Sequence, residues 1–79
     1  MAAQLTVEYD PVGDILTLGS VAPYAEQLSD ELDYGVVVRR NPESKAIENL
    51  EILFFTRRAA DGHRFEVPVW AEFRAQPVR

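Results

Sequence analysis

Residues 5–18 read LTVEYDPVGDILTL and place two short alternating runs around a turn. Apolar residues fall at every second position from Leu5 to Tyr9, which is the period of a β-strand. Residues 10–13 follow as Asp-Pro-Val-Gly, which is typical of a turn. The aspartate side chain can accept a hydrogen bond from a later backbone N–H, proline presets φ at the second position, and glycine tolerates a positive φ at the fourth. Residues 14–18 return as a second strand, so the stretch predicts a β-hairpin.

Further strands are indicated downstream. Residues 36–40 are three β-branched valines followed by two arginines, and this run predicts a strand. Residues 24–32 fit either an alternating strand or one or two helical turns, and we favour the strand. A bend over 33–35 separates these two segments, and a proline-containing turn over 41–44 follows the second.

Residues 46–55 predict the next strand, and its apolar phase slips partway along. Ile47 is odd, whereas the later apolar residues, Leu50, Ile52 and Phe54, are even. A bulge at Glu48-Asn49 would restore the phase, and asparagine tolerates positive φ better than most residues. A short helical turn is expected near 56–60.

Residues 65–73 show the cleanest alternation in the chain. The apolar series is Phe65, Val67, Val69, Ala71 and Phe73. Pro68 lies in the intervening series and cannot donate to a ladder, so this strand should lie at a sheet edge, or Pro68 should face an unpaired side.

The expected fold is mainly β: one small domain over 1–79, an antiparallel meander of five to six strands. A sheet without covering helices exposes its apolar face. In a chain of 79 residues, the free energy gained by burying apolar surface barely offsets the conformational entropy lost on folding. We therefore expect a homodimer or higher symmetric oligomer. The expected interface residues are Phe65, Val67, Val69, Trp70 and Phe73.

Charge is divided unevenly along the chain. Residues 1–38 hold seven acidic residues and no basic ones, whereas 39–79 hold all eight basic residues against six acidic ones. The net charge of -5 disfavours nucleic-acid binding and favours a basic protein partner, unless the acidic half merely faces the basic half. The candidate partner-binding residues are Glu26, Asp30, Glu31, Asp33, Arg57 and Arg58.

Catalytic chemistry has little support, and we predict no catalytic residue, metal or cofactor. The alternative is a ligand- or metal-binding protein, or an enzyme, built on clustered carboxylates, which needs Asp10 and Asp14 to converge with the acids of 26–33. His63 is the single histidine, and the chain has no cysteine, so a zinc site lacks its usual ligands. No signal-peptide or membrane-spanning pattern occurs, and a cytoplasmic location is expected.

The segments just described also carry a resemblance. Three short motifs carry it: Tyr9-Asp10 with Asp14, then Gly35-Val36, then Leu50-Glu51-Ile52-Leu53. With these motifs the chain resembles, over about residues 5–55, the small bacterial domain-of-unknown-function family numbered twenty-two eighty-three. Members usually have Asp-Gly where this chain has the turn 41–44, and Gly where it has Asn49. The resemblance implies a fold but no activity, and some members look like antitoxin-like partners of small toxin-like proteins.

Overall fold

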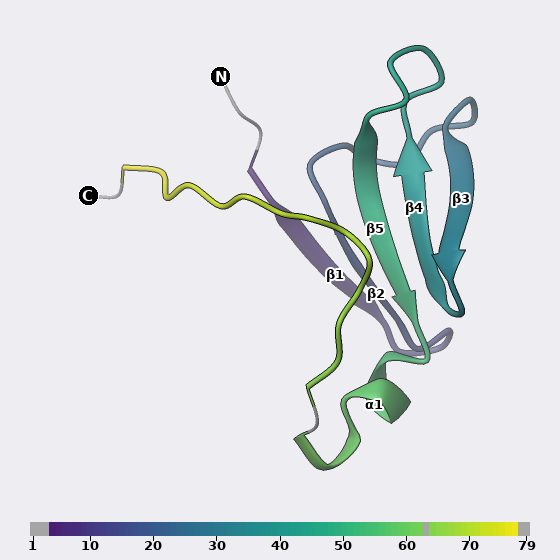
Figure 1. Ribbon diagram of the computed structural model, residues 1–79, viewed down its shortest axis with the longest axis vertical. Helices are drawn as coiled ribbons and strands as arrows, with labels where there is room; N and C mark the ends of the chain where they lie inside the picture. Colours follow the sequence, from purple (N-terminus) through teal and green to yellow (C-terminus); the bar gives the residue numbers. More distant parts are fainter. Residues whose placement is uncertain (1–3, 63, 78–79) are drawn as a thin grey trace.

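The computed structural model describes residues 4–62 and 64–77 and contains one five-stranded antiparallel sheet (Figure 1). The strands are β1 (Thr6–Asp10), β2 (Ile15–Gly19), β3 (Leu28–Asp33), β4 (Val36–Arg40) and β5 (Ile47–Leu53). Their order across the sheet is β1-β2-β5-β4-β3, so the first hairpin joins the β3–β4–β5 unit through the β2–β5 pair. The mainly antiparallel β class predicted from the sequence is confirmed.

The hairpin turn forms where it was predicted, with one difference in its backbone. Asp10 Oδ1 accepts from Val12 N at 3.0 Å, as expected. The positive φ belongs to Asp14 (57°) and not to Gly13. Asp14 tolerates this conformation because its carboxylate and carbonyl are both held by residues that follow β5, as described below.

The bulge in β5 is confirmed, again without the expected backbone angle. Arg39 pairs with Asn49 and Arg40 with Ile47, which leaves Glu48 as the additional residue. Asn49 does not have a positive φ. Instead its side chain lies over Gly19, where a Cβ would be 1.8 Å from Asn49 Oδ1. A glycine is therefore required opposite this asparagine.

Strand pairing places the apolar residues on one face of the sheet. Leu16 pairs with Ile52, and Ile52 pairs with Val36 on its other side. The polar partners, such as Thr17 and Glu51, fall on the opposite face. The buried centre of the apolar face consists of Val36, Val38 and Ile52, so the core is concentrated on β4 and β5.

A short helix follows β5 and redirects the chain. Helix α1 (Phe55–Arg58) and a 3-10 turn, η1 (Ala60–Gly62), occupy the region where a short helical turn was predicted. The chain then runs back across the apolar face toward β1 as an extended segment (Figure 1). We call residues 64–77 the tail.

The strand predicted over 65–73 does not form, and this prediction was wrong. In the described part of the chain, the tail's only backbone hydrogen bond joins Val69 N to Val67 O at 2.8 Å. The exit from α1 directs the tail over the face of the sheet, where no strand edge offers ladder partners, and Pro68 has no N–H. Phe65, Val67 and Val69 are half-buried and the residues between them are exposed, so the alternation reflects one side of the tail turned toward the rest of the fold.

Candidate functional site

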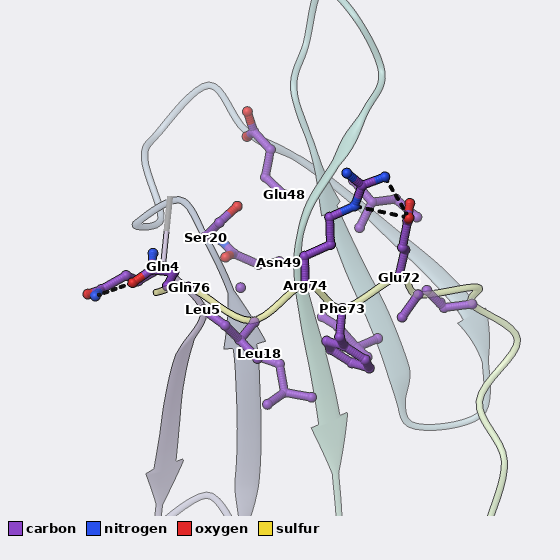
Figure 2. A pocket seen from close by; sticks show the side chains of 15 residues that line it. Gln4, Leu5, Leu18, Ser20, Glu48, Asn49, Glu72, Phe73, Arg74 and Gln76 are labelled. Carbon is purple, nitrogen blue, oxygen red and sulfur yellow. Dashed lines mark hydrogen bonds and ion pairs between the residues drawn. The ribbon is translucent and has the colours of Figure 1, made fainter. Parts of the chain in front are cut away.

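A groove lies between the tail and the apolar face (Figure 2). It has a volume of about 860 Å³ and is open to solvent. Leu18 of β2 and Leu50 of β5, a cross-strand pair, lie on the sheet side. Val69 and Phe73 line it from the tail. We call this feature the tail groove.

Two polar contacts lie along the tail groove, one on each side of it (Figure 2). Gln4 Nε2 donates to Gln76 Oε1 at 3.1 Å and links the two ends of the chain (Figure 2). Glu72 and Arg74 form an exposed ion pair at 3.0 Å. Exposed pairs of this kind contribute little to stability, so apolar contacts must hold most of the tail.

The predicted interface residues separate into two groups in the structure. Phe65, Val67 and Val69 are half-buried, whereas Trp70 and Phe73 are 101 % and 80 % exposed. Phe65 meets the Phe55 ring edge-on with 6.4 Å between centroids. The first group therefore belongs to the tail's own packing, and the second group remains free for other contacts.

The four predicted partner-binding acids lie along or just before β3, an outer strand of the sheet. Asp30 pairs with Arg40 at 3.4 Å. Glu31 Oε2 accepts from Gly35 N at 3.2 Å, and Asp33 Oδ1 accepts from Tyr34 N at 2.8 Å. All four, Glu26, Asp30, Glu31 and Asp33, fall on exposed positions. They define what we call the acidic edge.

Arg57 and Arg58 lie on α1, and Arg58 is bound to its own chain. Its Nε donates to Leu53 O at 3.2 Å, and its Nη2 donates to Tyr34 O. Its guanidinium also lies 5.8 Å from the centroid of Phe65. Arg58 thus joins the end of β5, the β3–β4 turn and the tail. Arg57 lies 6.0 Å from the Phe54 ring centroid.

Asp14 and Asp10 do not form a shared acid site. Asp14 Oδ1 accepts from the Tyr9 hydroxyl at 2.7 Å and from Thr56 N at 3.1 Å, while Oδ2 accepts from the Thr56 hydroxyl at 2.8 Å. Phe55 N donates to the Asp14 carbonyl at 3.1 Å. The Tyr9 bond, with help from Thr56, lowers the pKa of Asp14. Asp14 therefore anchors α1 to the first hairpin.

A second anchored carboxylate, Glu48, was not singled out from the sequence. Tyr24 and Gln27 donate to Glu48 Oε1 at 2.7 and 3.0 Å, and Asn41 donates to Oε2 at 3.2 Å. The Tyr24 bond is the main cause that lowers the pKa of Glu48, and it raises the pKa of Tyr24 to about 12. This carboxylate connects the β2–β3 and β4–β5 loops. Only the predicted bulge indicated that Glu48 differs from its neighbours.

Metal and membrane chemistry find no support in the described part of the chain. Over 4–62 and 64–77, no three His, Cys, Asp or Glu residues gather closely enough to hold a metal ion. No helix within those ranges has the length and apolar character that a membrane crossing needs. His63 lies outside the described residues.

Comparison with known proteins gives no relative for this site. No protein-family model matches the chain, and neither a curated protein nor a solved structure matches it.

Proposed function

We propose that the chain is a non-catalytic interaction module that works as a homodimer, with the apolar face and the tail forming the contact between copies. The observation that supports this is surface area. A single copy exposes 6511 Å², whereas a compact monomer of 8.9 kDa exposes about 4,800 Å². The excess, about 1,700 Å² per copy, comes from an open shape with an extended tail, and it leaves enough uncovered surface for the roughly 1,000 Å² or more per copy that permanent dimers bury.

The exposed apolar residues have the distribution that such a contact requires. On the apolar face, Val7 is 59 % exposed and Leu28 is 40 % exposed, on the two outer strands. The tail crosses only part of this face (Figure 1). Uncovered apolar area of this extent favours association in water.

The test is the oligomeric state of the purified chain, measured by sedimentation velocity across micromolar concentrations. We expect a dimer that persists in 1 M NaCl, because screening weakens charge pairs but not apolar burial. A monomer at every concentration would refute the proposal.

A second proposal concerns a heterologous partner: the acidic edge binds a basic protein, in the manner of an antitoxin-like neutraliser. It is supported by the exposure of the acids and by the unpaired outer side of β3. Asp30 is the member with an ion-pair partner among the described residues, at 3.4 Å from Arg40. Opposite charge would mainly accelerate association and set its salt dependence.

A synthetic Lys- and Arg-rich peptide provides the probe for this second proposal. The double variant Glu26→Gln/Asp30→Asn should weaken binding more than Glu66→Gln/Glu72→Gln, which removes the same charge from the exposed tail. Equal weakening by both pairs, or binding that ignores salt, would show that the acidic edge is not the contact.

The carboxylate-based alternative requires acids that the fold separates. Asp10 and Asp14 flank the turn of the β1–β2 hairpin, while the acidic edge lies on β3 at the far side of the sheet. We therefore propose the interaction module instead. Family membership, bacterial origin and a cytoplasmic location remain predictions from the sequence.

A further inference from the structure

The outward side of the tail carries an aromatic side chain with no contact to its own chain that would bury it. Trp70 is 101 % exposed and is the only tryptophan. Its neighbours along the tail, Val69 and Ala71, both line the tail groove. The chain therefore presents a large apolar ring immediately beside an open, largely apolar hollow.

Such a pair of features is self-complementary under a two-fold axis. In an isologous contact the same patch meets itself, so a projecting residue of one copy meets the hollow of the other, and the reverse holds equally. Tryptophan is also among the residue types that contribute most at interface centres.

We propose that a second copy of this chain seats its Trp70 in the tail groove, reciprocally, so that each groove holds the partner's indole ring. The inference rests on the proposed homodimer and specifies its geometry. Leu18 and Leu50 form the floor that the ring contacts. Phe73, which is 80 % exposed at the groove, closes over it.

Area and charge favour a second copy as the occupant. The excess of about 1,700 Å² per copy is twice the roughly 800 Å² that each partner buries in a standard complex. The charged side chains that the tail contributes to the groove, Glu72 and Arg74, neutralise each other as an ion pair. The acidic edge lies on β3, whereas the groove lies over β2 and β5, so two copies of net charge -5 can meet there.

The single tryptophan makes the proposal measurable without a label. At concentrations where sedimentation gives a dimer, Trp70 emission should be shifted to the blue and protected from acrylamide. Dilution to monomer should return the emission to that of exposed indole. The two transitions should share one midpoint.

Variants separate the ring from the hollow. Trp70→Ala should weaken the dimer at least about 30-fold for each of the two seated rings, the loss typical of an interface hot spot, while Trp70→Phe retains much of the affinity. Ala71→Glu alters an exposed groove residue and should leave Trp70 solvent-exposed at concentrations where the unsubstituted chain dimerises. Val12→Ala changes a residue that is 96 % exposed on the β1–β2 turn and serves as the unaffected control.

The outcomes distinguish the seating of Trp70 from the homodimer itself. A dimer whose Trp70 emission stays that of exposed indole, or a Trp70→Ala chain that dimerises as tightly as the unsubstituted one, would overturn the seating and leave self-association standing. A chain that is monomeric throughout would overturn both.

Discussion

Replacing Val38 by alanine tests where the core of this fold lies. Val38 is 0 % exposed, on β4 between Leu50 of β5 and Asp30 of β3. Removing two methyl groups costs about 1.6 kcal/mol in transfer free energy. A residual cavity of roughly 50 Å³ adds about 1 kcal/mol. We therefore expect the free energy of unfolding to fall by about 2–3 kcal/mol.

Thermal unfolding followed by circular dichroism measures this loss. For a chain of this length the loss corresponds to a decrease in Tm of about 10–20 °C. Protein concentration must be fixed, because association contributes to apparent stability. Val12→Ala is the matched control: the same substitution at a 96 % exposed site should change stability by less than about 0.5 kcal/mol. Equal losses in the two variants would refute the placement of the core.

Two further predictions concern the loops. Glu48 and Asp14 both have lowered pKa values in the folded chain. In acid the unfolded chain therefore binds more protons than the folded chain. The stability that the two carboxylates contribute is complete above their unfolded pKa values and is lost as the pH falls through their folded pKa values. Tm should therefore fall between pH 6 and pH 3, and Glu48→Gln should reduce that slope; an unchanged slope would contradict the role given to Glu48. Gly35→Ala should destabilise the fold more than Gly62→Ala, although both glycines have a positive φ near 70°. A Cβ at Gly35 would lie 2.8 Å from Arg58 Nη2, whereas a Cβ at Gly62 would meet no atom within 4 Å among the non-adjacent residues that the structure describes. Urea midpoints that fall equally would show that Arg58 moves freely away from Gly35.

Local sequence was sufficient for β1, β2, β4 and the turn of the first hairpin. Alternation over 5–9 and 14–18, the Asp-Pro turn between them and the β-branched run at 36–38 each depend on neighbouring residues only, so their patterns carry the information. The slip of phase between Ile47 and Leu50 likewise identified a bulge, because a single additional residue exchanges the two faces of a strand.

The tail shows how far periodicity alone carries a prediction. Over 65–70 the alternation matches the exposure: Phe65, Val67 and Val69 are half-buried, and the residues between them are exposed. The same pattern failed to reveal that the segment lacks a strand partner. An extended chain alternates whether or not a ladder pairs with it, so periodicity alone cannot distinguish an edge strand from a tail lying over a face.

Sequence by itself determined the β class, the hairpin, the position of the bulge and the uneven distribution of charge. Tertiary structure alone decided that β2 pairs with β5, that Asp14 and Glu48 fasten loops distant in sequence, and that the tail forms a groove beside Trp70. The physical reason is range: turns and alternation arise from steric and solvation preferences of adjacent residues. Which strand edges meet, and which carboxylate finds which donor, depends on contacts made only after the whole sheet has assembled.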